Sequence, residues 1–354
     1  MSGTEPNKAE PNKAEPNTAE PNKSAANVTM RDVAKAAGVS VATVSHVVNN
    51  KPGARIGDEA RRRVQDAVVA LGYRPNALAK TLSRGGSRFI GLVADAIATT
   101  PFAGQIIHGA QDEAWAHGYV LLVANTDGNE AAENEAIAMM LEHQVRGILY
   151  SSWYHREIVV PEMLHQTDTV LVDCFAEGSG LPAVVPDEEQ GGRTATEELL
   201  AAGHRRIAFI NTTTPSPAQS GRLAGYRAAL EAAGVAFDDS LVFPAEPAQE
   251  GGYATAPRIV ESEATAVFCH NDRVAMGLYD GLRELGLSIP TDVAVMGFDN
   301  QDVIAAHLRP PLSTVALPHY ELGAAGVRTL LGIESSTDEQ LIRVACPSVP
   351  RHSI

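Results

Sequence analysis

From Phe89 onward, short apolar runs alternate with longer amphipathic segments in two successive rounds. The first round contains the runs FIGLVAD, YVLLVANT, RGILYSS and TVLVDC, and the second contains RRIAFIN, ATAVFCH and VAVMGF. Such continuous apolar runs predict parallel strands, and the segments between them have helical spacing. We therefore expect a two-lobed α/β body, each lobe a mostly parallel sheet covered by helices on both faces. Ligands bind such sheets at the carboxyl ends of the strands, so a cleft between the lobes is the expected site.

Residues 28–74 have the pattern of a small all-α domain. Thr29 and Asp32 have the spacing of a capping box before the segment MRDVAKAA, and Gly38 can end that helix in a left-handed turn. Ser40 can cap a second helix, VATVSHVV. Two short helices joined by a tight turn are therefore expected at the start of this domain.

A third helix, DEARRRVQDAVVAL, is expected to end at Gly72. Gly57 precedes it and has no side-chain oxygen, so its N-terminal cap should be slightly weaker than a serine cap. Three short helices bury only a small core. The residues expected in that core are Val33, Ala37, Val39, Val44, Val47, Val48, Val68 and Leu71.

Charge is distributed unevenly along the chain, whose formal net charge is −15. Residues 28–88 hold 11 Lys and Arg against 4 Asp and Glu, whereas residues 89–354 hold 14 Arg, no Lys and 35 Asp and Glu. A basic module attached to an acidic body is typical of a nucleic-acid binder. Because the body would repel DNA, we expect contact to be confined to the module.

The second helix has the arrangement of a helix-turn-helix, with an outward face free to enter the major groove. Its expected contacts are base edges for Val41, Ala42 and His46, and phosphates for Thr43, Ser45 and Asn49. Small apolar side chains suit thymine methyl groups, and an imidazole can bond guanine N7 or O6. The alternative is an ordinary helical hairpin.

These residues resemble the lac/gal repressor family of bacterial transcription regulators. The stretch VTMRDVAKAAGVSVATVSHVVNN resembles the family's DNA-binding domain, and SGRLAGYRAAL, AVFCHNDRVAMG and IPTDVAVMGFDN resemble its effector-binding body. The resemblance covers residues 28–354. It implies a homodimer, possibly a higher oligomer, that binds a palindromic DNA operator under the control of a small molecule.

The resemblance also implies a hinge helix at PNALAKTL. Leu82, with Ala79 beside it, would wedge into the minor groove and bend the operator, although a packed linker leucine is the alternative. The expected organisation has four parts. They are a disordered tail of EPNKA repeats (1–27), the helix-turn-helix domain (28–74), the hinge (75–87) and the body (88–354), with a first lobe of about 88–186 and 318–343 and a second of 187–317 and 344–354.

Motif by motif, the resemblance places an aromatic ring, carboxylates, an amide and a guanidinium at the cleft. These residues are Phe102, Asp173, Asp187, Arg222, Asn271, Asp272 and Asp299. Directional donors and acceptors around an apolar face suit a polyhydroxylated ligand. Three of them have a structural alternative as helix caps (Asp187, Asp272 and Asp299), and Phe102 has one as lobe core.

The expected effector is a sugar or sugar derivative. Pro101 stands where the purine-repressor pattern has an aromatic residue, which argues against a purine. Trp153 and Tyr154 follow the run RGILYSS and could stack on a sugar ring or lie in a surface loop.

Two other classes of protein fit less well. A solute-binding protein of a transporter shares the bilobal fold, but this sequence has a DNA module and no signal peptide, so a cytoplasmic protein with no membrane partner is expected. An enzyme could use His270 and Asp272, yet no nucleophile elbow, phosphate-binding loop or metal motif accompanies them, and no cofactor is expected. A regulator that activates transcription through a protein co-regulator stays an alternative.

Overall fold

The structure is a computed structural model that describes residues 28–49, 56–73, 87–96, 104–333 and 340–354. The chain divides into two compact units, Met1–Arg84 and Gly85–Ile354. The expected tail and three expected site residues (Ala79, Leu82 and Phe102) lie outside the described residues. Among the helices that are described, none has the length and apolar character needed to cross a membrane.

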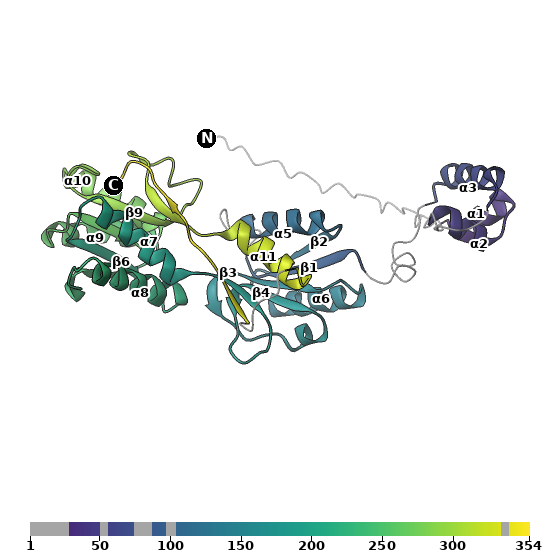
Figure 1. The fold of residues 1–354 in the computed structure, drawn as a ribbon, viewed down its shortest axis with the longest axis horizontal. Helices are drawn as coiled ribbons and strands as arrows, with labels where there is room; N and C mark the ends of the chain where they lie inside the picture. Colours follow the sequence, from purple (N-terminus) through teal and green to yellow (C-terminus); the bar gives the residue numbers. More distant parts are fainter. Residues whose placement is uncertain (1–27, 50–55, 74–86, 97–103, 334–339) are drawn as a thin grey trace, which may run out of the picture. The chain divides into compact units, whose positions relative to one another are not determined.

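The N-terminal unit contains α1 (Met30–Ala37), α2 (Val41–Val48) and α3 (Asp58–Leu71) (Figure 1). The capping box is confirmed, because Thr29 Oγ1 accepts from the Asp32 backbone and Asp32 Oδ2 accepts from the Thr29 backbone. Gly38 ends α1 with a φ of +62°, and Ser40 caps α2 through the Thr43 backbone N–H. The sequence therefore predicted both ends of the tight turn correctly.

The core of this unit differs from the prediction at one end of α3. Leu71 was expected inside, yet it is 37% exposed, whereas Tyr73 is only 7% exposed. Gly72 adopts a φ of +61° and turns the chain, so that the Tyr73 backbone N–H bonds the Val68 carbonyl. This helix-ending motif places the residue after the glycine against the helix, which is why the aromatic ring and not Leu71 joins the core.

The first lobe of the C-terminal unit is a parallel sheet. Its described strands, in the order β11-β5-β4-β3-β1-β2, are Leu341–Val344, Ala183–Pro186, Thr169–Phe175, Ile148–Glu157, Phe89–Ala94 and Val120–Asn125. The helices around it are α5 (Gly104–Ala116), α6 (Glu130–Glu142), α11 (His319–Leu330) and the short 3₁₀ helix η2 (Glu162–Gln166). One apolar cluster joins α5 and α11 to the sheet, and another joins α6 and η2.

The second lobe repeats this plan. Its described strands, in the order β12-β10-β9-β8-β6-β7, are Ser348–Val349, Ser313–Ala316, Ala294–Asp299, Ala266–Cys269, Ile207–Thr212 and Val242–Ala245, and only β12 is antiparallel to its neighbour. The helices are α7 (Glu188–Ala201), α8 (Pro217–Ala232), α9 (Gln249–Glu261) and α10 (Asp272–Glu284), with the 3₁₀ turn η3 (Asp239–Leu241) before β7.

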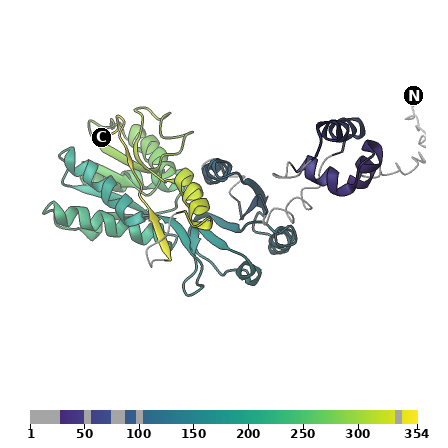
Figure 2. The same cartoon turned by 45° about the vertical axis from the view of Figure 1, so that its right-hand side comes forward.

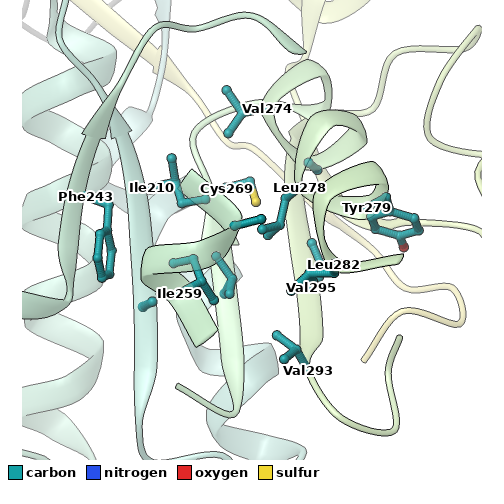
Figure 3. Close-up of a cluster of buried hydrophobic side chains, with 14 of the residues drawn as sticks. Ile210, Phe243, Ile259, Cys269, Val274, Leu278, Tyr279, Leu282, Val293 and Val295 are labelled. Carbon is teal, nitrogen blue, oxygen red and sulfur yellow. The ribbon is translucent and has the colours of Figure 1, made fainter. Parts of the chain in front are cut away.

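Alternate residues of each central strand face opposite helices, as expected of a doubly covered sheet. Ala208 and Ile210 of β6 belong to the cluster formed with α9 and α10, which Figure 3 shows in close-up. Ile207 and Phe209 belong instead to the cluster formed with α7 and α8. The predicted fold class, a small helical domain followed by two α/β lobes, is therefore confirmed.

Within the described residues, the chain passes between the two sheets at three places: from β5 to α7, from β10 to α11, and from β11 to β12. The C-terminal segments, yellow in Figures 1 and 2, accordingly belong to both lobes. These crossings bring the ends of β5, β10 and β11 to one region, and that region holds the candidate site.

Candidate functional site

A cavity of about 320 Å³ lies between the two lobes of the C-terminal unit. Side chains from β3 and β4 line it on one side, those from α8 and the ends of β6, β8 and β9 line it on the other, and Glu188 and His319 line it beside the crossings. Its size is at the lower end of the range of small-molecule sites. Of the expected residues, four line this cavity: Asp173, Arg222, Asn271 and Asp299.

Arg222 lies near the start of α8, at a close approach of that helix to α7. A Cβ on Gly192 of α7 would lie 2.4 Å from the Arg222 carbonyl oxygen, so only glycine allows the two helices to come this near. Glu188, one turn before Gly192, then faces the guanidinium, and Arg222 Nε donates to Glu188 Oε2 at 2.8 Å. This ion pair is almost completely buried.

The guanidinium of Arg222 is fixed on two further sides. Nη1 donates to the backbone oxygen of His270 and lies 3.9 Å from Asp299 Oδ1. The Phe298 ring lies beneath it, with its centre 3.7 Å from the guanidinium carbon, in a cation–π contact. Arg222 is therefore held in place by α7, by the residue after β8 and by β9.

Burial and charge pairing shift the pKa values of Glu188 and Arg222 in opposite directions. Burial alone would raise the pKa of Glu188, but Arg222 and His155 lower it to about 2. Burial alone would lower the pKa of Arg222, but Glu188 and Asp299 raise it above its ordinary value. Both side chains are therefore charged at neutral pH.

Asp299 and Asp173 lie at the cavity with backbone conformations that L-residues seldom adopt, at φ values of +102° and +57°. Such conformations are strained and occur most often at functional sites. Burial raises the pKa of Asp299 to about 6 despite the opposing charge of Arg222, and Gln301 Nε2 donates to its Oδ2. Burial, and then Glu188, raise the pKa of Asp173 well above its ordinary value.

In the part of the chain that the structure describes, three histidines line the cavity, and none was expected there as a ligand contact. His155 Nδ1, on β3, is buried, lies 3.5 Å from Glu188 Oε1, and has no hydrogen-bond partner among the described residues. Burial lowers the pKa of His319 to about 4. Burial and the charge of Arg222 hold the pKa of His270 well below its ordinary value. His270 and His319 are therefore neutral at pH 7.

Trp153 and Tyr154 line the same cavity, with ring centres 4.8 Å apart in a T-shaped pair. The expectation that they follow the strand was wrong, because β3 continues to Glu157. After an irregularity, β3 pairs again with β4 at Arg156, and Asp95 accepts from the Trp153 backbone at 2.9 Å. The strand therefore carries both aromatic rings along the cavity wall.

Asp187 and Asp272 are not among the cavity-lining residues. Asp187 caps α7 by accepting from the Gln190 backbone. Asp272 is fully buried and accepts from the Gln301 backbone and from the Thr314 hydroxyl, each at 2.7 Å, so it ties the start of α10 to the segments around β9 and β10. The cap of α10 is Asn271, which also lines the cavity.

Helix α2 presents the expected outward face. Val41 is 43% exposed, Ala42 is exposed, and the other four expected contacts are half-buried: Thr43, Ser45, His46 and Asn49. Val44 and Val47 on the opposite face are buried in the core of the unit. The first residues of α2 are thus the most accessible, as a helix that inserts its N-terminus into a groove requires.

Comparison with known proteins decides the family. Residues 29–76 match the family described as bacterial regulatory proteins, lacI family, and residues 196–354 match the periplasmic binding protein-like domain. The chain is 33% identical over 306 residues to the ribose operon repressor of Haemophilus influenzae, covering 86% of this chain and 91% of that protein. The chain belongs to the lacI family.

This lacI-family protein is also 33% identical over 307 residues to the HTH-type transcriptional repressor PurR of Vibrio atlanticus, covering 86% of this chain and 91% of the relative. Among solved structures, it resembles the lac repressor dimer bound to operator and the anti-inducer ONPF, with a TM-score of 0.75, 25% identity, and 93% and 99% of the two chains covered. It is therefore a DNA-binding transcription regulator and not an enzyme, as the sequence predicted.

Proposed function

We propose that this lacI-family regulator is a repressor that binds a palindromic operator as a homodimer and is released by a sugar or sugar derivative bound between its lobes. The observation that carries the proposal is the fixed guanidinium of Arg222 in the interlobe cavity, with Asp299 on one side. A guanidinium donates to hydroxyl oxygens and a carboxylate accepts from hydroxyl hydrogens, and a sugar offers both.

The aromatic wall supports a sugar in particular. Trp153 and Tyr154 line the side of the cavity that the first lobe contributes, so an apolar sugar face has a surface to pack on. Asp173 and Asn271 add polar groups on two different elements, which suits several hydroxyls spaced around a ring. The relative named for the ribose operon is in keeping with this ligand class.

The DNA contacts that we propose follow the exposure of α2. Base edges would be contacted by Val41, Ala42 and His46, and phosphates by Thr43, Ser45 and Asn49. Outside the described residues, Leu82 beside Ala79 would form the minor-groove wedge.

A second copy would cover the edge of the first sheet. β2 is an edge strand, and Val120, Leu122 and Val123 on it are 44%, 36% and 43% exposed. Exposed apolar edge strands tend to pair or pack with another chain. The solved relative is described as a dimer on its operator, which fits this arrangement.

The test uses the purified full chain. A palindromic binding sequence is first selected from random duplex DNA, and its affinity is then titrated with and without D-ribose, D-xylose, D-glucose, D-galactose and cellobiose. We expect one of these sugars to weaken operator binding by about 5- to 150-fold, the usual range of allosteric coupling.

The matched variant is Arg222→Ala, which should bind the operator but lose the response to the sugar. Tighter operator binding with sugar would make the ligand a corepressor. A full response in Arg222→Ala would mean that the cavity is not the sensor, and no selected palindrome would contradict the operator proposal.

A further inference from the structure

The hydrogen bonds of Arg222 leave little of its guanidinium for an anion. Nε donates to Glu188, and one N–H group of Nη1 donates to the backbone oxygen of His270. A guanidinium grips a phosphate or carboxylate through two N–H groups on one edge, either Nε with Nη2 or Nη1 with Nη2. Each edge of Arg222 therefore already has one nitrogen engaged. The remaining donors suit a hydroxyl, which needs only one.

The charges around the cavity are also balanced. Among the described residues, two guanidiniums line it, those of Arg222 and Arg273. Glu188 is the carboxylate paired with Arg222, and Arg273 favours the ionised form of Asp299. His270 and His319 add no positive charge at neutral pH, and His155 faces the same Glu188 carboxylate. An anionic ligand would meet no surplus of positive charge among these groups.

We propose that Glu188 is a specificity-determining residue that restricts the cavity to uncharged polyols and excludes phosphorylated or carboxylated sugars. Its carboxylate engages one of the two guanidinium edges that an anion could use, and it would repel a second anion at close range in a buried site. This inference rests on the proposed function of the cavity as the effector site and narrows its ligand class.

The test measures binding of inorganic phosphate to the full chain by titration calorimetry and by ³¹P line broadening. Glu188→Gln removes the charge and keeps the side-chain length, whereas Glu188→Ala also vacates the Nε edge. The matched control is Glu189→Gln, because Glu189 is the next residue of α7, is exposed and pairs with Arg193. Circular dichroism and thermal melting establish that each variant is folded.

We expect no saturable phosphate binding to the wild type or to Glu189→Gln. Glu188→Gln should bind phosphate saturably, with an affinity at least about tenfold above the weakest that the titration detects, and Glu188→Ala should bind it more tightly again. Adding Arg222→Ala to either variant should abolish the gain. Saturable binding to the wild type that Arg222→Ala removes would overturn the proposal, and so would folded Glu188 variants that gain nothing.

If neither Glu188 variant folds, saturable phosphate binding to the wild type that Arg222→Ala removes would still overturn the proposal, because the proposal requires that the wild-type cavity reject phosphate. The readout needs no sugar. Failure of every sugar to change operator affinity would therefore count against the proposed effector class, while the phosphate titration would still report on Glu188.

Discussion

His155 Nδ1 and Glu188 Oε1 lie 3.5 Å apart, and the two residues belong to different lobes. Both side chains are less than a tenth exposed. The other oxygen of the same carboxylate accepts from Arg222. One buried carboxylate thus contacts a histidine of the first lobe and an arginine of the second.

Arg222→Lys should show whether ligand binding depends on the positive charge of Arg222 or on its planar guanidinium. Lysine keeps a cation near Glu188 but loses the bond to the His270 carbonyl and the planar stack on Phe298. We expect sugar affinity to fall by about tenfold or more, which corresponds to about 1.4 kcal/mol, while operator affinity without sugar is unchanged. Calorimetry with the active sugar and operator titration measure the two quantities. An unchanged sugar affinity would show that the planar guanidinium is not what recognises the ligand.

The buried imidazole of His319 should make stability fall in mild acid. Its pKa in the folded chain is about 4, against an ordinary value of 6.5, because burial disfavours the charged form. The unfolded chain therefore takes up a proton at higher pH than the folded chain. The contribution of neutral His319 to the free energy of unfolding is therefore fully present above pH 6.5. It is lost as the pH falls towards 4, by about 3 kcal/mol in all.

His319→Gln should remove this part of the pH dependence. Guanidinium unfolding of the wild type and the variant at a series of pH values gives the difference between their unfolding free energies. That difference cancels the groups that both proteins share, including Asp299, whose raised pKa acts in the opposite sense. A difference that stays constant between pH 6.5 and 4 would contradict the assignment.

The sequence predicted those features that local chemistry determines. Helix caps depend on one or two side chains near a turn, and Thr29, Gly38 and Ser40 behave as expected. Continuous apolar strands also suffice to predict sheets covered on both faces. Strand ends at a shared edge, together with the family resemblance, led to four residues that line the cavity.

The sequence could not tell which of two neighbouring side chains faces the cavity. Asp187 and Glu188 are adjacent acids, but the first caps α7 and the second, about 100° further round the helix, faces Arg222. His155 was missed because the extension of β3 past the apolar run depends on its pairing with the end of β4, the next strand along the chain. Such choices are tertiary, so single-sequence patterns do not contain them.

The caps of α2 and α3 predict opposite effects of two substitutions. Ser40 accepts from the Thr43 backbone at 3.1 Å, so Ser40→Ala should destabilise α2 by about 1 kcal/mol. Gly57 caps α3 without a side chain, in an extended conformation with open space around it, so Gly57→Ser should stabilise α3 by about a few tenths of a kcal/mol. Amide hydrogen exchange of the full chain resolves the two helices. Equal protection of α2 in wild type and Ser40→Ala would show that the cap bond is unimportant.

His46 gives the most direct test of how the regulator reads DNA. It lies in the last turn of α2 and is half-buried, whereas Val44 and Val47 of the same helix are buried in the core. A histidine that bonds a guanine edge adds discrimination, whereas one that bonds only phosphate adds affinity for any sequence. His46→Ala should therefore cost about 1–3 kcal/mol on the selected operator and relax the preference at one base pair of each half-site.

Binding of wild type and His46→Ala is compared on the selected operator, on operators with each base pair changed, and on random duplex DNA. Gln65→Ala is the matched control, because Gln65 is an exposed polar residue of α3 and is not proposed to contact DNA. Its affinities should equal those of the wild type.

A loss of affinity that is equal on operator and random DNA would assign His46 to the phosphates. A loss confined to the operator, with a changed preference at one base pair, would establish His46 as a base-reading residue. The salt dependence of operator affinity separates the same two cases. Removing a phosphate contact makes the plot of log affinity against log salt concentration less steep, whereas removing a base contact leaves its slope unchanged.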